Sequence, residues 1–411
     1  MTSPERRIPL RLAAALSATA FLVGCGGPPT GGDPSAPIEL DASDIEILGK
    51  SESLAVVQDL EVTSDGSVWV FNSVEPYFIG FGQDGESLGA HGRAGGGPGE
   101  FPMPSAFLAG GWEGEAWVFD LRRHAMIRIS RPNADWAEIP LRSESLPPGS
   151  IRGGMNLLSA AVRTARLGGE IIVPRARPPG EGSMLALRLS LLGADLMAVD
   201  PETAGTRTLV TLGAVLDDPS GDFVPSEGGF PQWYRLWASC AGNRVRVYDR
   251  VRNQLRGFDG SGAEVAPVDL PPVPFTEVSP RRFAGAVFEL RQAELTGDVR
   301  GRLGEADRQR VLNQMARGVS GSPRELATYL PHYVDFRCSE DGTMWMHPFD
   351  PDAGGLNGGP RWLRVSPDGV ARDVRLPDRF DALRFSGSRI WGVYRDELDV
   401  PSVASIPLPA G

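Results

Sequence analysis

The stretch DLEVTSDGSVWVFNSVEPYFIGFGQDGESLGAH, residues 59–91, contains two successive hairpin patterns. Apolar and polar residues alternate around the turn Ser64–Gly66, and a second turn, Gln83–Gly85, separates two further short runs. Asp-Gly between alternating runs is a strong hairpin signal because both residues tolerate positive φ. The stretch therefore predicts four antiparallel strands in about 40 residues, which is the size of one propeller blade.

The same signature returns along the chain as a hydrophobic triplet that follows a polar or glycine-containing turn. Its recurrence at intervals of about 45 residues or more is typical of stacked units that cannot bury their apolar faces alone. The triplets are Val68-Trp69-Val70, Ala116-Trp117-Val118, Ile171-Ile172-Val173, Val245-Arg246-Val247, Met344-Trp345-Met346 and Ile390-Trp391-Gly392. Six triplets predict an all-β fold, a six-bladed β-propeller, in which the recurring tryptophans pack between blades.

The last unit has only three recognisable strands, at Ala382–Phe385, Arg389–Tyr394 and Val403–Pro407. The N-terminal segment Ile45–Leu48 can supply the missing fourth strand. Such pairing joins the two ends of the fold and protects an otherwise open strand edge.

A helical insertion is predicted between blades four and five, over about residues 280–328. Alternation stops there, and apolar residues recur at helical spacing, which indicates two amphipathic helices with a first start at Ser279-Pro280. Two roles remain open for this insertion. It covers the mouth of the central channel, as functional loops on rigid scaffolds do, or it pads a surface.

A glycine-rich segment follows the first unit: Gly92–Phe101 (GRAGGGPGEF), then Pro104, Trp117–Asp120 and Met126–Ile129. This pattern resembles the NHL repeat, and its G-P-G-E-F version resembles NHL-related six-bladed propeller lipoproteins of bacteria, in the TolB-like propeller superfamily. The resemblance implies a propeller of a kind that commonly binds partners. Blade three departs most, with Pro174 near its strand end. The glycine loop lacks the Lys-Ser/Thr of a phosphate-binding loop, so we interpret it as an inter-blade connection.

Residues 1–24 have the composition of an export signal. A basic start at Arg6-Arg7 precedes an apolar run over 12–23, which is too short to span a membrane as a mature helix. The small residues before Cys25 resemble a bacterial lipobox, which implies that the signal is removed and Cys25 is lipidated. The alternative is an ordinary secretory signal with a cysteine nearby by chance.

Beyond the signal, residues 25–37 are rich in glycine, proline and serine and are typical of a flexible tether. The propeller is expected over residues 38–411. Gly26, rather than aspartate, follows the cysteine, and by resemblance to the lipoprotein sorting rule this favours the outer membrane. The sequence thus predicts an exported protein, lipid-anchored in the cell envelope and facing the periplasm or the surface, with the membrane as a partner through its lipid.

Composition restricts the class of partner. The net charge is −11 and the pI is about 5.0, so the chain offers no basic surface for nucleic acid. Cys240 and Cys338 each stand just before a repeat turn. Two buried free thiols are the favoured interpretation. The alternative, open in an oxidising compartment, is a disulfide, which requires Cα atoms within about 7 Å.

No catalytic constellation stands out, and the histidines are dispersed without metal-ligand spacing. The segment Asp350–Gly354 has two carboxylates at alternate positions, as calcium loops do, but lacks the remaining ligands of that pattern. A solvated surface loop and a Ca²⁺ site both remain open there. No other cofactor or metal is predicted.

His332 and Tyr333 directly follow the insertion, where a cover would meet the channel mouth, and are the candidate residues for polar ligand contacts. Lactonase-like propellers place a metal in the channel with Glu, Asn and Asp ligands, and this chain has Glu61, Asn72 and Asp120. Asn72 and Asp120, however, end the second strand of their blades, where such residues commonly hydrogen-bond the following turn.

The leading functional hypothesis is a membrane-anchored envelope lipoprotein that acts as a non-catalytic propeller and binds an envelope protein or a small ligand. Its basis is the repeat architecture, the lack of a catalytic grouping and the NHL-like resemblance. The alternative is a metal-dependent, lactonase-like propeller hydrolase with its site in the central channel. A fold class alone does not decide between them.

Overall fold

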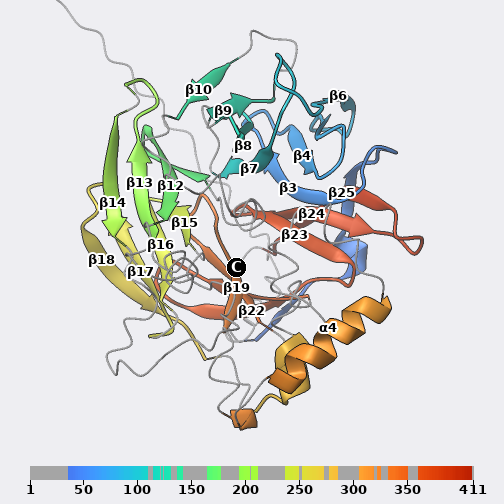
Figure 1. The fold of residues 1–411 in the computed structure, drawn as a ribbon, viewed down its shortest axis with the longest axis vertical. Coiled ribbons are helices and arrows are strands. Elements are labelled where there is room, and N and C mark those ends of the chain that lie inside the picture. Colours follow the sequence, from blue (N-terminus) through green and yellow to red (C-terminus); the bar gives the residue numbers. More distant parts are fainter. Residues whose placement is uncertain are drawn as a thin grey trace, which may run out of the picture. The chain divides into compact units, whose positions relative to one another are not determined.

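The chain forms two compact units, Met1–Ala36 and Pro37–Gly411. The computed structural model describes residues 36–109, 114–120, 122–123, 125–130, 137–141, 164–176, 194–203, 205–211, 237–249, 252–272, 277–285, 305–318, 322–324, 332–349 and 360–409. The second unit is an all-β, propeller-like arrangement of small antiparallel sheets (Figure 1). The predicted signal, Cys25 and the tether lie outside the described residues. In the part of the chain described, no helix is long and apolar enough to cross a membrane.

Residues 57–91 form an antiparallel meander, called meander 1. It consists of β3 (Val57–Val62), β4 (Val68–Asn72), β5 (Phe78–Phe81) and β6 (Ser87–His91). The strands pair in chain order, with Leu60 opposite Val70 and Gly80 opposite Gly89. Both predicted Asp-Gly hairpins are therefore confirmed.

Two further meanders share one eight-stranded sheet. Meander 2 consists of β7 (Pro104–Ala109), β8 (Trp117–Asp120), β9 (Ala125–Arg128) and β10 (Glu138–Pro140). Meander 3 consists of β11 (Thr164–Leu167), β12 (Glu170–Ala176), β13 (Ala194–Val199) and β14 (Thr206–Thr211). Parallel pairing of β7 with β11, with Leu108 opposite Thr164, joins them into one sheet.

Meanders 4 and 5 follow. Meander 4 consists of β15 (Trp237–Cys240), β16 (Arg244–Asp249), β17 (Gln254–Asp259) and β18 (Glu264–Asp269). Meander 5 consists of β19 (Tyr333–Cys338), β20 (Met344–Pro348), β21 (Arg361–Val365) and β22 (Ala371–Arg375). The short strand β1 (Ile38–Glu39) adds to its outer edge, parallel to β22.

Meander 6 joins the two ends of the folded unit. It consists of β23 (Phe380–Phe385), β24 (Arg389–Arg395), β25 (Pro401–Pro407) and the N-terminal β2 (Glu46–Gly49), which follows the 3₁₀ turn η1 (Ala42–Asp44). β2 pairs antiparallel with β25, with Glu46 opposite Ser405. The prediction that an N-terminal strand completes the last unit is confirmed.

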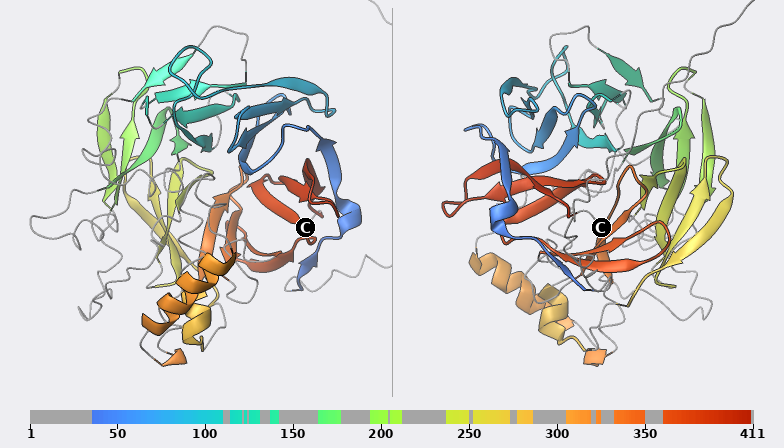
Figure 2. Two further views of the ribbon diagram at one scale, coloured as in Figure 1. Left: turned by 45° about the vertical axis from the view of Figure 1, so that its right-hand side comes forward. Right: turned by 180° about the vertical axis from the view of Figure 1, so that it is seen from behind.

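The first strand of each meander, β3, β7, β11, β15, β19 and β23, is called an inner strand. Consecutive inner strands contact each other along the chain, and β23 contacts β3. The contacts between described inner strands therefore close into a cycle, and Figure 2 shows the sheets from two further sides.

The recurring tryptophans pack against the meander that follows. Trp69 lies in a core cluster with Val118 and Ile127 of meander 2, and Trp345 lies with Phe385 and Ile390 of meander 6. The partly buried Trp391 packs on Leu60 and Val68 of meander 1, and Trp117 packs on Ile171 and Val173 of meander 3. The predicted packing role of these tryptophans is confirmed.

The glycine-rich loop after meander 1 adopts backbone angles that favour glycine. Gly92 and Gly99 have φ of 86° and 74°. Glu100 holds the loop by accepting hydrogen bonds from Gly97 N at 2.8 Å and Arg93 Nε at 3.0 Å. Phe101, 1% exposed, then enters the core against Phe78 with ring centroids 4.7 Å apart. The loop connects two meanders, as the sequence predicts.

Helical structure lies between β18 and β19. Residues 280–285 are helical, and Ser279 Oγ accepts a hydrogen bond from Arg282 N at 3.3 Å. The helix α4 (Glu305–Gly318) lies at the periphery of the sheets in all three views of Figures 1 and 2. The predicted insertion includes further residues that the structure does not describe, so its role as a cover stays a prediction.

Candidate functional site

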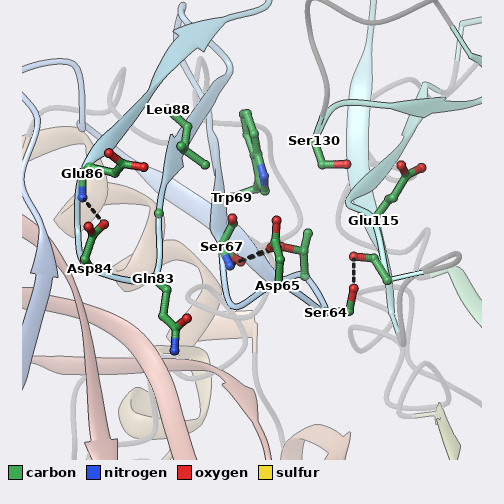
Figure 3. Close-up of a pocket in the computed structure, with 13 residues that line it drawn as sticks. Ser64, Asp65, Ser67, Trp69, Gln83, Asp84, Glu86, Leu88, Glu115 and Ser130 are labelled. Carbon is green, nitrogen blue, oxygen red and sulfur yellow. Dashed lines mark hydrogen bonds between the residues drawn. The ribbon is translucent and has the colours of Figure 1, made fainter.

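A groove of about 740 Å³ lies between meanders 1 and 2 (Figure 3). Its volume falls within the range of about 300–1,000 Å³ common for ligand pockets. Most lining residues lie in or beside the β3–β4 and β5–β6 turns of meander 1, and the others lie just before β8 and just after β9 in meander 2. The lining residues are Thr63, Ser64, Asp65, Ser67, Trp69, Gly82, Gln83, Asp84, Glu86, Leu88, Gly114, Glu115 and Ser130.

The two meanders are hydrogen-bonded to each other at the rim of this groove. Ser64 N donates to the carbonyl of Gly114 at 2.9 Å, and Ser64 Oγ lies 3.5 Å from the same carbonyl. Gly114 has φ of 73°, and a Cβ atom there would lie 2.2 Å from Ser64 Oγ. Only glycine therefore fits this junction without displacing the opposite turn.

The groove is acidic. Four carboxylates line it and no basic side chain does. Glu115 forms an ion pair with Arg128 at 3.4 Å, whereas Asp65, Asp84 and Glu86 have no ion-pair partner among the residues described. Hydrogen bonds from the Thr63 hydroxyl and the Ser67 backbone lower the pKa of Asp65, so this carboxylate stays ionised at neutral pH.

A second group of charges joins the inner strands of meanders 6 and 1. Arg384 of β23 makes a two-pronged contact with Asp59 of β3, Nη1 to Oδ1 at 2.9 Å and Nη2 to Oδ2 at 3.0 Å. Its Nε donates to Glu61 Oε2 at 3.1 Å. The exposed fractions of these three side chains are only 14%, 16% and 8%. We call Asp59, Glu61 and Arg384 the ring-closing triad.

The strand register places charged residues of three inner strands at one level. The register pairs are Glu61–Trp69, Arg337–Trp345 and Arg384–Trp391, so each charged residue stands opposite the tryptophan of its own triplet. Arg337 forms an ion pair with Asp335 at 3.2 Å. At the same level of β11 and β15 stand Ala165 and Ala238. The charges on this level are thus concentrated on β3, β19 and β23.

The electrostatics of the triad depend on burial. Burial raises the pKa of Glu61 to about 7; the nearby Arg384 guanidinium offsets part of this rise, and Asp59 adds to it. Burial also opposes the charge on Arg384, but the carboxylates of Asp59 and Glu61 hold its pKa above the usual value. With Glu61 protonated, Asp59 and Arg384 balance each other, so the triad is neutral.

Stability is therefore expected to depend on the ionisation of Glu61. Its folded-state pKa is about 7 and its reference value is 4.5, so between these pH values the folded protein binds more protons than the unfolded chain. The free energy of unfolding contributed by this group should fall as pH rises, by roughly 3 kcal/mol in total. Urea unfolding over this pH window, for wild type and Glu61→Gln, measures the effect.

The variant Glu61→Gln should lose this pH dependence, whereas Glu397→Gln, on the exposed β24–β25 turn, should retain it. A wild-type stability that rises with pH relative to Glu61→Gln would contradict the raised pKa.

Asn72 and Asp120, two candidate ligands of a channel metal, form hydrogen bonds with nearby backbone groups instead. Asn72 Oδ1 accepts from Ala55 N at 3.2 Å, and its Nδ2 donates to the carbonyl of Val74, in the turn after β4, at 3.2 Å. Asp120 accepts from Met103 N and Arg122 N, both at 3.0 Å. The alternative interpretation, hydrogen bonding to the adjacent turn, is confirmed for both.

Tyr333 lies in the core rather than at a surface. It is 1% exposed, and its hydroxyl donates to the carbonyl of Pro271 at 2.7 Å. Burial accordingly raises the pKa of its hydroxyl. Tyr333 is therefore a packing residue in this structure, and its neighbour His332 is partly exposed. The predicted binding role stays a prediction for His332.

The described carboxylates of the inner strands are the candidate oxygen ligands for a Ca²⁺ ion. Asp59 and Glu61 both face the Arg384 guanidinium, and a divalent cation there would be repelled by it. Among the described residues, no group of three or more His, Cys, Asp or Glu side chains has the geometry of a metal site. These residues do not fit Ca²⁺, and the Asp350–Gly354 segment lies outside the described part.

The groove and the triad have no counterpart in the predicted set of site residues, apart from Glu61. A signal for two triad members does exist in the sequence, because Glu61 and Arg384 each precede the tryptophan of their triplet, Trp69 and Trp391, by a similar spacing. The groove has no such signal, since its walls come from turns of two different meanders.

No family model matches this sequence, and no curated protein matches it. Solved structures similar to it include a putative exported protein from Bacteroides fragilis, with 8% identity, TM-score 0.46 and coverage of 91% and 99% of the two chains. Others are the calcium-binding protein regucalcin from Agrobacterium tumefaciens, with 11% identity, TM-score 0.41 and coverage of 92% and 97%. Virginiamycin B lyase from Staphylococcus aureus has 9% identity, TM-score 0.38 and coverage of 92% and 96%. Identities and TM-scores this low do not indicate the function of this chain.

Proposed function

We propose that this chain is a six-bladed propeller that binds a ligand or protein partner in the cell envelope, anchored by lipid at Cys25. The cyclic contacts of the inner strands support six blades, with each meander as one blade. The groove between meanders 1 and 2 carries the binding function, because it combines a ligand-sized volume with exposed polar turn residues that are open to a ligand.

The competing function is metal-dependent hydrolysis in the central channel. It requires carboxylates that are free to bind a cation. In the inner strands described, Asp59 and Glu61 form ion pairs with Arg384, and Asp335 forms an ion pair with Arg337. Because these carboxylates already have a cationic partner, the structure favours binding over metal-dependent hydrolysis.

A ligand screen by thermal unfolding tests the binding function. A ligand that binds only the folded protein raises the melting temperature in proportion to its occupancy. We expect compounds or peptides that stabilise wild type and fail to stabilise Gln83→Trp, in which an exposed wall residue is enlarged to fill the groove. The matched variant Glu397→Trp, on an exposed turn elsewhere, should respond as wild type does. Metal-dependent turnover of a lactone would instead favour hydrolysis.

The anchor makes a separate prediction. Replacing Cys25 by serine removes the acylated atom, so the protein should appear in the soluble fraction instead of the membrane fraction. Each acyl chain contributes about 0.8 kcal/mol per buried CH₂, and more than one chain holds a protein firmly. Fractionation of cells together with incorporation of labelled palmitate measures the change. Equal membrane association of wild type and Cys25→Ser would contradict the lipid anchor.

A further inference from the structure

The junction between meanders 4 and 5 differs from the others in the residue at the centre of the preceding triplet. Meanders 1, 2, 5 and 6 have a tryptophan there, and Ile172 of meander 3 likewise packs against the meander that follows. Meander 4 has Arg246, which is 8% exposed and donates from Nη1 to the carbonyls of Ala266 at 2.7 Å and Leu255 at 3.4 Å. Both acceptors belong to meander 4 itself. Among the described residues, Arg246 therefore makes no hydrogen bond from meander 4 to meander 5.

The chain connects these two meanders only loosely. Between β18 and β19 it passes through residues 270–332, which include α4, whereas only residues 376–379 separate β22 from β23. A longer connection restricts the separation of the strands that it joins less strongly. The junction between meanders 4 and 5 therefore depends on direct contacts between the two sheets.

The described contacts at this junction include an apolar cluster and a covalent bond. The cluster contains Tyr248 of β16 and Phe336 of β19, and the rings of Tyr248 and Tyr333 meet edge to face with centroids 5.5 Å apart. The covalent bond is the disulfide between Cys240 of β15 and Cys338 of β19. Neither cysteine is fully buried, so the bond is open to a small thiol in solution. The junction thus has a covalent link that a reductant can break.

The strand that carries Cys338 also holds the start of the insertion. At the other end of β19, the Tyr333 hydroxyl donates to the carbonyl of Pro271, just after β18, at 2.7 Å. Farther along, Val278 N donates to the carbonyl of Pro323 at 2.9 Å, which joins a segment before α4 to a segment after it. A movement of β19 away from meander 4 would break the Tyr333–Pro271 hydrogen bond. The position of β19 therefore affects how firmly the start of the insertion is attached.

We propose that the Cys240–Cys338 disulfide is a redox switch for this junction: its reduction loosens β19 from meander 4 and frees the start of the insertion. Three observations support the switch, namely Arg246 in place of a tryptophan, the long connection, and a covalent link that is open to solvent. The inference goes beyond the proposed binding function and does not depend on it.

The reductant is a dithiol. One of its thiolates attacks a sulfur of the disulfide and forms a mixed disulfide, and the other cysteine leaves as a thiolate. The second thiolate of the reductant then displaces the remaining cysteine. Two electrons and two protons pass to Cys240 and Cys338, which become thiols, and the reductant ends as its own disulfide.

Hydrogen–deuterium exchange of the full-length protein in detergent, measured by mass spectrometry before and after treatment with dithiothreitol, tests this inference. Short labelling times are used, because local openings then dominate the exchange. We expect backbone amides of β15, β19 and residues 277–285 to exchange about tenfold faster after reduction. Amides of β3 and β23, at the junction of meanders 6 and 1, should keep their rates.

The variant Cys240→Ser/Cys338→Ser is the matched control. It should exchange as reduced wild type does, with and without dithiothreitol, because the reagent acts through this bond. Alkylation with iodoacetamide, mapped to the peptides that contain Cys240 and Cys338, measures the extent of reduction. The comparison of oxidised and reduced wild type needs no substitution, so it remains decisive if the variant does not fold.

Unchanged exchange of β15 and β19 in wild type whose two cysteines have been reduced would overturn the inference. Equal acceleration in all six meanders would also overturn it, because the disulfide would then affect global stability alone. Cysteines that react with iodoacetamide before reduction, or that remain unreactive after dithiothreitol under native conditions, would equally contradict a switch.

Discussion

Replacing Arg384 by methionine is expected to lower the free energy of unfolding by about 3–5 kcal/mol at about pH 8, measured by urea unfolding. The guanidinium is the only basic group within ion-pair distance of Asp59 and Glu61 among the described residues. Without it, the largely buried Asp59 carboxylate loses its counter-ion, and Glu61 loses the charge that offsets the rise in its pKa. The contact also links β23 to β3, and the residues that it joins are 323 and 325 positions apart in sequence.

The matched control is Arg361→Met in the exposed pair with Asp373, whose side chains are 51% and 37% exposed. Exposed ion pairs contribute about 1 kcal/mol or less, so this variant should change little. Replacing all three triad residues by apolar residues should restore much of the loss, because no unpaired charge then remains. An Arg384→Met variant as stable as Arg361→Met would contradict the role of the triad in closing the ring.

The second large effect concerns the disulfide that links two inner strands. The structure joins Cys240 of β15 to Cys338 of β19, with Cα atoms 5.2 Å apart and a sequence separation of 98 residues. A link over so long a loop restricts the unfolded chain strongly, so the Cys240→Ser/Cys338→Ser variant should unfold about 2–5 kcal/mol more easily. Urea unfolding of both proteins without reductant measures this difference.

Dithiothreitol provides the internal control for this prediction. It should destabilise wild type to about the level of the double serine variant and leave the variant itself unchanged. Wild type that is insensitive to dithiothreitol, and no more stable than the variant, would indicate two free thiols. That result would agree with the interpretation that the sequence favours.

Local features of the fold follow from the sequence because their causes lie within a few residues. Asp-Gly turns between alternating runs predict the hairpins of meander 1, and the structure has strands on both sides of each turn. The recurrence of tryptophan predicts inter-sheet packing, because a side chain of that size on a small sheet needs a neighbouring sheet to bury it. Trp69 and Trp345 are 2% and 0% exposed.

The functional residues were predicted less well, because a residue type at a strand end does not say where its oxygens point. Asn72 and Asp120 have the chemistry of metal ligands, but backbone amides next to them occupy those oxygens. Tyr333 follows the insertion, yet the start of β19 turns its ring into the core. For Asn72 and Asp120 the structure agrees with the hydrogen-bonding interpretation drawn from the sequence, and for Tyr333 core packing competes with contact to an external ligand.

The sequence by itself determined the hairpins, the repeat and the strand that completes meander 6, since these depend on short-range turn chemistry and on period-two alternation. Only the tertiary structure decided which charges meet. Arg384 and Asp59 are 325 positions apart and touch because the last inner strand returns beside the first. The groove likewise exists only where turns of two meanders meet. Contacts of this kind depend on how the sheets close around one another, which no local pattern encodes.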